Sequence, residues 1–406
     1  MAEFIERLES QLVGWLGAPS ILRGLFDEAR AVDPVLVVGG RALVSSFAGV
    51  TEVLTDPSFG VKEIYAARME RTSGAFFLGM DAGPAYDREA SLVRQVVRPA
   101  DIGTVRSIAR ATAWDLVDAA RPVGTMDAVA GFSRIIPTRI VQQFFGVPGP
   151  SDADLMRWMR TIFWEIFLNL TNDAAVAVAA DASSHELSPY LMGLIEARKA
   201  DRLKGSRDDF LCRLIDQQKQ PGGGFDDDGI RRNIGGIIVG AVDTQSKAIA
   251  HALEQLLKRP AALEIARTAA CEGNDVLLRG AVFEALRYNP MNPVLPRFCQ
   301  RDHVLDHGTG RAKKVPQGTL VFASTFGAMF DDAKVEAPGE FRADRPSDNY
   351  LHFGLGLHRC FGERFNDVVL PEAIKAILSL PELRLEGAIQ YDGPFPEHLA
   401  VRFDPR

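Results

Sequence analysis

Apolar residues recur at helical spacing over most of the chain, and strand-like stretches are short and few. Residues 1–30 repeat apolar positions every four residues, which predicts a helix. Two short β-rich stretches, residues 34–40 and 42–46, predict a hairpin that turns at Gly39-Gly40. A short helix is predicted over residues 50–54. The pattern therefore indicates a mainly α chain with a small β region near its start.

The longest helical pattern covers residues 230–257 and contains residues that helices disfavour. Gly235, Gly236 and Gly240 lie in its interior, where each glycine costs about 1 kcal/mol relative to alanine. Glycine at these positions predicts close packing against the helix backbone or a local distortion. The polar pair Asp243 and Thr244 follows an apolar stretch of the same helix, and both are poor helix formers.

Composition and charge narrow the class of protein. The chain has 406 residues, 47% of them hydrophobic and 24% charged, as in soluble globular proteins. No low-complexity linker divides it, so we expect one domain over residues 1–406. The net charge of −7 argues against nucleic-acid binding, which requires a basic surface.

Neither a signal peptide nor a membrane anchor is indicated. The first residues are acidic and amphipathic, and no run of 18 apolar residues occurs. The four cysteines are scattered without C-x-x-C spacing, so we expect neither a zinc site nor a disulfide framework. A cytoplasmic protein is expected.

One ten-residue stretch, residues 353–362, concentrates candidate chemistry. It reads Phe-Gly-Leu-Gly-Leu-His-Arg-Cys-Phe-Gly and is followed by a helical pattern. Cys360 therefore precedes a helix N-terminus, which favours the thiolate. Glycines let the backbone approach a flat group, and backbone amides can donate to the sulfur. Such a thiolate suits the axial position of a haem iron. The alternative is a buried cysteine of the core, the usual role of a lone cysteine.

This stretch resembles the signature F-x-x-G-x-x-x-C-x-G of the cytochromes P450 at every fixed position. The resemblance implies haem b (iron protoporphyrin IX) as cofactor, with Cys360 as the axial metal ligand. The other residues that it places at the cofactor are Phe353, Gly354, His358 and Gly362, and His358 is expected to anchor a propionate.

A second segment, residues 240–245, resembles the family motif [AG]-G-x-[DE]-T-T of the central helix. Ala241 replaces the second glycine, and Gln245 replaces the second threonine. The resemblance implies that Asp243 and Thr244 act catalytically by supplying protons for oxygen activation. It also places Ala241 against the haem.

Glu284 and Arg287 reproduce the E-x-x-R spacing of the family. They lie on one helix face, and the apolar residues around them indicate burial. The resemblance implies a third partner in the loop before the cysteine, for which Arg345 is the candidate. We expect this trio to have a structural role. The alternative is an ordinary surface ion pair.

The family also places an arginine on a haem propionate, and Arg297 occupies that position. Tyr86 and Ala90 stand where a histidine and an arginine often contact the propionates. Tyr86 can still donate a hydrogen bond to a carboxylate, and Arg88 or Arg94 could supply the charge.

Large apolar residues in three regions are candidates for the substrate pocket, although ordinary core packing is the alternative for each. They are Phe76, Phe77, Phe163, Phe167, Val294 and Leu295. We therefore expect a small hydrophobic substrate.

The resemblance covers nearly the whole chain and implies a triangular, mainly α cytochrome P450 fold with a small β region. It implies a monooxygenase that uses dioxygen and NAD(P)H, with electrons delivered by a separate ferredoxin or flavodoxin and its reductase. Basic residues between Arg88 and Arg110 could receive an acidic partner, or could be a solvated helix face. We expect a monomer.

Two other functions remain open. A peroxide-driven haem-thiolate peroxygenase or isomerase would not need the pair Asp243 and Thr244, but the departures at Tyr86 and Gln245 are compatible with one. A haem protein that only binds ligands or senses a gas would need neither a proton relay nor a docking surface.

Overall fold

A five-stranded sheet joins the start of the chain to a segment almost 300 residues later. The computed structural model describes residues 19–201 and 207–405. The sheet has the order β1-β2-β8-β5-β3, with β1 and β2 antiparallel and β2 parallel to β8. Its strands are β1 (Val35–Val38), β2 (Arg41–Val44), β3 (Phe59–Gly60), β5 (Leu295–Cys299) and β8 (Leu320–Ala323). The predicted hairpin is confirmed.

Short helices pack beside this sheet. They are α2 (Pro19–Val32), α3 (Phe47–Thr55) and α15 (Thr325–Ala328), and a hairpin of β6 (His303–Leu305) and β7 (Lys313–Val315) lies next to α3. Ser46 begins α3 because its side chain accepts a hydrogen bond from the amide of Gly49. The helix predicted for residues 1–30 is present from Pro19, and its first 18 positions lie outside the described residues.

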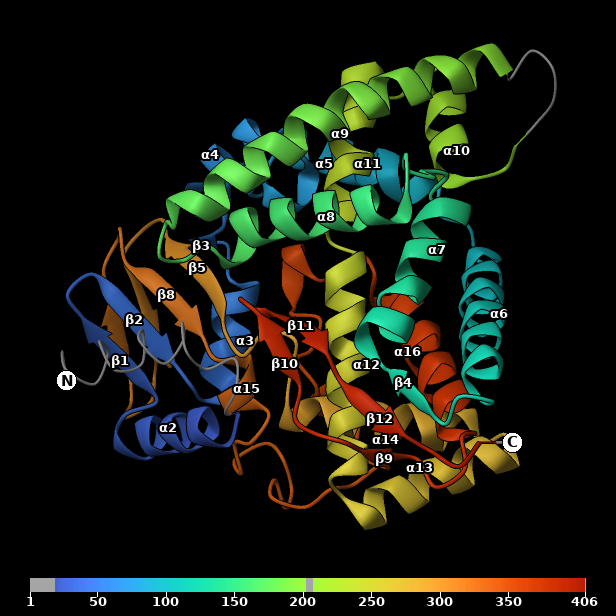
Figure 1. Cartoon of the computed structure of the whole chain (residues 1–406). Helices are drawn as coiled ribbons and strands as arrows, with labels where there is room; N and C mark the ends of the chain where they lie inside the picture. Colours follow the sequence, from blue (N-terminus) through green and yellow to red (C-terminus); the bar gives the residue numbers. More distant parts are fainter. Residues whose placement is uncertain (1–18, 202–206, 406) are drawn as a thin grey trace.

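Helices make up most of the remaining chain, so the mainly α prediction is confirmed. Figure 1 shows α12 running through the centre, with α9 across the top and the five-stranded sheet at the left. The helices are α4 (Lys62–Arg71), α5 (Pro84–Gln95), α6 (Asp101–Ala120), α7 (Ile135–Gln143), α8 (Asp152–Phe163), α9 (Ala174–Asp201), α10 (Phe210–Gln217), α11 (Asp227–Val239), α12 (Val242–Leu257), α13 (Pro260–Glu272), α14 (Asp275–Tyr288) and α16 (Glu363–Leu378).

Short turns and strands complete the chain. The π-helical turns are η3 (Val129–Ser133) and η4 (Trp164–Leu168), and the 3₁₀ turns are η2 (Phe77–Gly79), η5 (Ser347–Asn349) and η6 (Gly356–His358). Two small sheets near the C-terminus contain β4 (Thr125–Asp127), β9 (Arg384–Leu385), β10 (Gln390–Asp392), β11 (Phe395–His398) and β12 (Ala400–Arg402).

The long helix predicted over residues 230–257 is two helices, because the chain breaks at Gly240-Ala241 between α11 and α12. The glycines were expected to reflect close packing or a local distortion, and both are observed. A Cβ atom at Gly236 would lie 2.4 Å from the ring of Phe76, so only glycine fits there. Gly240 lies at the break itself. The helical pattern is therefore confirmed on both sides of the break, and the local distortion that its glycines indicated lies at Gly240-Ala241.

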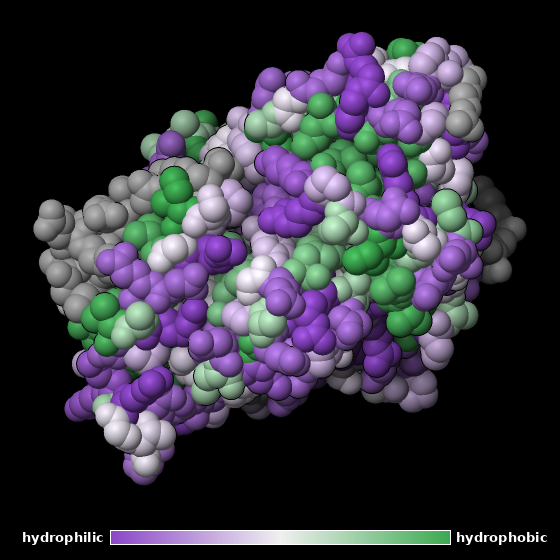
Figure 2. Space-filling model, turned by 90° about the horizontal axis from the view of Figure 1, so that it is seen from below, coloured by the Kyte–Doolittle hydropathy of each residue, from purple (hydrophilic) through white to green (hydrophobic). Residues whose placement is uncertain are grey.

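The face seen from below mixes charged and apolar residues, with the apolar ones in separate groups (Figure 2). None of the helices in the described ranges combines the length and apolar character needed to cross a membrane.

Candidate functional site

A cavity of about 480 Å³ lies in the centre of the molecule. The stretch of residues 353–362, termed the cysteine loop from here on, forms one wall. Helix α12 and the end of α11 form another. The segment leading into β5, the end of α8 with η4, and the turn between β10 and β11 complete the lining. Elements far apart in the sequence therefore converge on one cavity.

The cysteine loop is held in shape by glycine conformations and backbone hydrogen bonds. Gly354 and Gly356 adopt φ values of 64° and 68°, which other residues rarely tolerate. A Cβ at Gly356 would also lie 2.5 Å from the carbonyl oxygen of Leu54. The amide of Cys360 donates to the carbonyl of Phe353 at 2.9 Å, which closes the loop. Cys360 lines the cavity and is accessible there, although protein surrounds it closely.

Two opposing effects act on the pKa of Cys360. Burial raises the pKa of its thiol, and the amides of Gly362 and Glu363 lower it by less. The helix N-terminus therefore contributes in the expected direction, against a larger effect of burial. A bound metal cation deprotonates a coordinating thiol outright, so the iron of a cofactor would favour the thiolate of Cys360.

Two basic side chains at the cavity each leave one nitrogen without a partner, although Arg297 Nη1 donates to the carbonyl of Pro296 at 2.9 Å. Arg297 and His358 line the cavity, and Arg297 Nε and His358 Nδ1 are buried without a hydrogen-bond partner among the described residues. Burial lowers the pKa of both groups, that of His358 to about 4. Unpaired buried donors are costly, and two propionates would satisfy them. A thiol, a glycine-lined approach and these two groups fit haem b.

Of the other residues predicted to contact the cofactor, all except Tyr86 line the cavity. Phe353, Gly354, Gly362 and Ala241 line the cavity. Tyr86 does not: its hydroxyl donates to the carbonyl of Leu357 at 2.8 Å and accepts from Arg94 at 3.1 Å. The hydroxyl is thus committed to the cysteine loop, and the predicted contact between Tyr86 and a propionate is not supported. Arg88 contacts the carbonyl of Gly224 instead.

The central helix places Thr244 in the cavity wall at the start of α12. Its hydroxyl donates to the carbonyl of Gly240 at 2.6 Å. That carbonyl lies at the break between α11 and α12, where regular helical hydrogen bonding is interrupted. Thr244 therefore stabilises the distorted turn and brings a hydroxyl to the cavity.

Asp243 lies behind the cavity wall in a buried cluster of charges and does not line the cavity. Its Oδ1 lies 3.1 Å from Arg160 Nε and 3.6 Å from Arg134 Nη2. Arg160 also pairs with Glu397 and Asp392, at 2.5 and 3.0 Å. Asp243 Oδ2 is buried and has no partner in the described ranges.

This environment changes the acidity of Asp243. Burial raises its pKa to about 6, although Arg160 lowers it by charge and by hydrogen bonding. Glu397 and Asp392 raise it further. A carboxyl group with this pKa exchanges a proton near neutral pH, as an acid–base group should. Sequence reasoning found Asp243 but not Arg160, which is 83 positions away and carries no motif.

Five of the six predicted substrate residues line the cavity. They are Phe76, Phe163, Phe167, Val294 and Leu295. Phe77 is fully buried and packs against Phe76, Tyr86 and Phe361 outside the cavity lining, so its assignment to the pocket is corrected to core. Phe76 is extended and η2 begins at Phe77, so the two neighbouring rings point in different directions.

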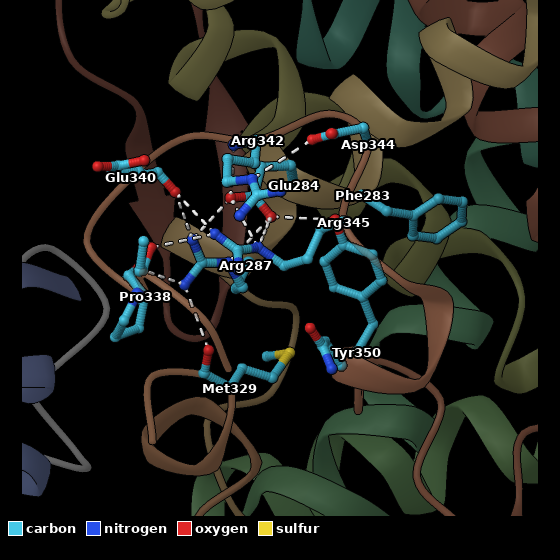
Figure 3. A network of polar contacts seen from close by, with 12 residues as sticks. Phe283, Glu284, Arg287, Met329, Pro338, Glu340, Arg342, Asp344, Arg345 and Tyr350 are labelled. Atoms are coloured by element: carbon cyan, nitrogen blue, oxygen red, sulfur yellow. Dashed lines mark hydrogen bonds and ion pairs between the residues drawn. The ribbon is translucent and has the colours of Figure 1, made fainter. Parts of the chain in front are cut away.

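The structure brings Glu284, Arg287 and Arg345 together without solvent contact (Figure 3). Arg287 donates to both carboxylate oxygens, at 2.6 and 3.0 Å, and Arg345 Nε lies 3.3 Å from Oε2. The hydroxyl of Tyr350 and the amide of Arg342 also donate to Glu284. Burial alone would raise the pKa of Glu284, but these partners outweigh it and hold that pKa below its usual value.

The two arginines of this trio fix the chain that leads to the cysteine loop. Their guanidinium groups donate to the carbonyls of Met329, Glu336, Ala337, Pro338 and Glu340. A buried pair with all of its hydrogen bonds made is a specific structural anchor. This geometry supports the structural role expected for the trio.

Comparison with known proteins agrees with this geometry. The family model described as "Cytochrome P450" matches residues 158–385. A mycinamicin IV hydroxylase/epoxidase from Micromonospora griseorubida is 28% identical over 378 residues, covering 90% of this chain and 89% of that protein. Luteothin monooxygenase from Streptomyces thioluteus is 24% identical over 372 residues, covering 89% and 84%. The crystal structure of CalO2 superposes with a TM-score of 0.82 at 23% identity, covering 95% of this chain and 98% of that one.

Proposed function

The chain belongs to the cytochrome P450 family and is a haem-thiolate monooxygenase, and we propose that it hydroxylates or otherwise oxidises a small hydrophobic molecule with electrons from a separate ferredoxin system. Its cofactor is haem b, dioxygen is the co-substrate, and NAD(P)H supplies electrons through redox partners. The proposed setting is a monomeric single domain, residues 1–406, in the cytoplasm.

One observation supports this proposal above the others. Cys360, the unpaired groups of Arg297 and His358, and the hydroxyl of Thr244 all line one cavity. A thiolate-bound haem supplies the activation of dioxygen for insertion of one oxygen atom into a substrate bond. Cys360 would hold the metal, and Arg297 and His358 would each hold a propionate. Gly354 and Gly362 leave room for the flat face of the macrocycle.

The remaining residues of the cavity have separate roles in the proposal. Phe76, Phe163, Phe167 and Val294 exclude water and bind apolar surface. Thr244 holds a proton donor at the cavity wall. Asp243, on the neighbouring position of α12, takes protons from the polar cluster around Arg160 and passes them toward Thr244.

An electron-transfer partner should approach the side of the molecule where the basic residues lie. Arg94, Arg106 and Arg110 are exposed on α5 and α6. Arg94 also contacts Tyr86, which is bonded to the cysteine loop. An acidic ferredoxin fits this surface by charge. Nearby acids offset part of the charge, since Arg106 lies 3.6 Å from Asp275.

The proposal is tested by reconstitution. Candidate substrates are screened by the spin-state change that they cause in the holoenzyme. The selected substrate is then incubated with NAD(P)H, ferredoxin, ferredoxin reductase and ¹⁸O-labelled dioxygen. We expect one labelled oxygen atom in the product. Turnover with hydrogen peroxide, without turnover in the reconstituted system, would instead favour the peroxygenase alternative.

Replacement of Thr244 by alanine is expected to uncouple electron use from product formation. The cavity wall then lacks its hydroxyl donor, and the carbonyl of Gly240 loses a hydrogen bond. Product formed per NAD(P)H should fall roughly 10-fold or more, with hydrogen peroxide released instead. Thr244→Ser is the matched control because it keeps the hydroxyl. Unchanged coupling in the alanine variant would remove Thr244 from the proton path.

The pH dependence of coupled turnover should report Asp243. Because the pKa of Asp243 is about 6, the rate of coupled turnover should change with pH near that value. This change should be absent in Asp243→Asn. Arg160 lowers the pKa of Asp243, so Arg160→Gln should move that ionisation to higher pH. Arg134, Glu397 and Asp392 face the same carboxyl and stay in place. A shift to lower pH, or none, would contradict the assignment.

A further inference from the structure

Among the residues that the structure describes, four that line the cavity have a buried polar atom without a hydrogen-bond partner. They are Gln245, Arg297, His358 and Asn366. Two of these, Arg297 and His358, are accounted for by the propionates of the cofactor. A third, Asn366, leaves its Oδ1 unpartnered beside Cys360, where its Nδ2 donates to the carbonyl of Gly362 at 3.1 Å. The fourth is Oε1 of Gln245, and an amide oxygen is an acceptor that a propionate carboxylate cannot complete.

Gln245 has an unusual environment for a carboxamide. It directly follows Thr244 on α12, its residue surface is only 6% exposed, and its Oε1 has no partner in the described ranges. A buried carboxamide left unsatisfied is destabilising, and most such groups in proteins are bonded. An unsatisfied group that lines a binding cavity is most simply explained by a ligand that completes it.

The turns of α12 on either side of Gln245 present small apolar side chains to the cavity. Ala241 and Ala248, one turn before and after it on α12, also line the cavity, and Leu286 and Pro290 contribute further apolar surface. At the η4 side of the cavity, the side chain of Asn169 is already bonded to Glu165 and Asp173. A polar substrate group bound at Gln245 would complete its unsatisfied carboxamide.

The chemistry of the carboxamide indicates which group this is. Oε1 accepts hydrogen bonds and Nε2 donates them, and rotation of the amide plane exchanges the two atoms. A hydroxyl group both donates and accepts, so it can satisfy either orientation. One polar contact in an apolar pocket is also what fixes the orientation of a bound ligand.

We propose that Gln245 is a specificity-determining residue that binds a hydroxyl group of the substrate, so that the enzyme acts on apolar molecules that already carry a hydroxyl. This proposal rests on the proposed monooxygenase function and adds the substrate class. The bound hydroxyl sets which part of the apolar skeleton is presented for oxidation. The hydroxyl must then be present before this enzyme acts, so a hydroxyl-forming reaction precedes it.

The test uses the holoenzyme and matched pairs of probe ligands. Adamantane is paired with 1-adamantanol, and cyclododecane with cyclododecanol. The dissociation constant of each probe is measured from the spectral change of the haem in the native protein and in Gln245→Met, which keeps the length of the side chain but removes the amide. Native protein should bind each alcohol roughly tenfold more tightly than its hydrocarbon. In Gln245→Met the two should bind alike.

Two further variants make the result specific. Ala248→Val reshapes the same wall without changing its polarity, so it should alter both members of a pair alike and keep their ratio. Gln245→Glu keeps an oxygen acceptor and should keep the preference for alcohols. The proposal is overturned if native protein shows no preference, or if Gln245→Met retains it. The reduced carbon monoxide spectrum of each variant separates failure of this proposal from failure of the haem-thiolate assignment.

Discussion

Replacement of Cys360 by alanine will abolish haem-thiolate chemistry. No other cysteine lines the cavity in the described part of the chain, so the variant has no thiolate to offer the metal. Haem retained by Arg297, His358 and apolar contacts alone should bind more weakly. Product formation should fall below detection, because the electron donation that supports O–O cleavage depends on the thiolate.

The measurement is the haem content of the purified variant, followed by reconstituted turnover. Cys271→Ala is the matched control, since Cys271 is an exposed cysteine of α13 and should tolerate the change with full haem content. Cys360→Ser separates geometry from chemistry because it keeps the size of the side chain without the soft sulfur ligand. Normal turnover in Cys360→Ala would refute the ligand assignment.

The second large effect is expected on stability rather than on chemistry. Glu284→Ala leaves the guanidinium groups of Arg287 and Arg345 buried without their carboxylate partner. Breaking a buried pair in this way costs about 3–5 kcal/mol. Because the trio fixes the chain before the cysteine loop, haem retention should fall together with the free energy of unfolding.

Urea and thermal unfolding measure this change. Asp344→Ala is the control: Asp344 lies in the same loop, 72% exposed, and pairs with Arg342 at 3.5 Å. Removing an exposed pair of that kind should cost about 0–1 kcal/mol. Equal losses in the two variants would contradict the anchoring role of Glu284.

The pH dependence of the Glu284→Ala effect has a defined sign. The pKa of Glu284 in the folded protein is below its ordinary value, so its contribution is fully present above the unfolded pKa, near about 4.3. The contribution is lost as the pH falls through the folded pKa. The difference in unfolding free energy between native protein and Glu284→Ala should therefore shrink in acid.

Motifs with local chemistry were the most predictable part of the site. Cys360 and the glycines around it lie within ten residues. Because glycine has no side chain, these glycines indicate that a flat group approaches the backbone closely. The pair Glu284 and Arg287 is fixed by helix geometry. Arg345 could be named only because the family resemblance indicated a third partner, since nothing in the local sequence of that loop specifies a contact 61 positions away.

Features that depend on tertiary contacts could not be predicted. The glycines of residues 235–240 indicated close packing or a distortion, but not that Phe76 packs against Gly236 or that Thr244 binds the carbonyl of Gly240. Tyr86 has the right chemistry for a propionate, but its hydroxyl is taken by the carbonyl of Leu357. Phe76 and Phe77 are neighbouring residues of the same type, so the sequence alone does not show which side chain faces the cavity. Because a 3₁₀ turn begins at Phe77, the two side chains point in different directions.

The central claim is that Cys360 binds the iron of haem b as a thiolate. The most direct test is the absorption spectrum of the native protein, reduced with dithionite and exposed to carbon monoxide. A thiolate opposite carbon monoxide gives a Soret band shifted far to the red, and the account predicts that band. A haem spectrum without the shift would show that Cys360 is not the thiolate ligand, and a protein that binds no haem would contradict the account as a whole.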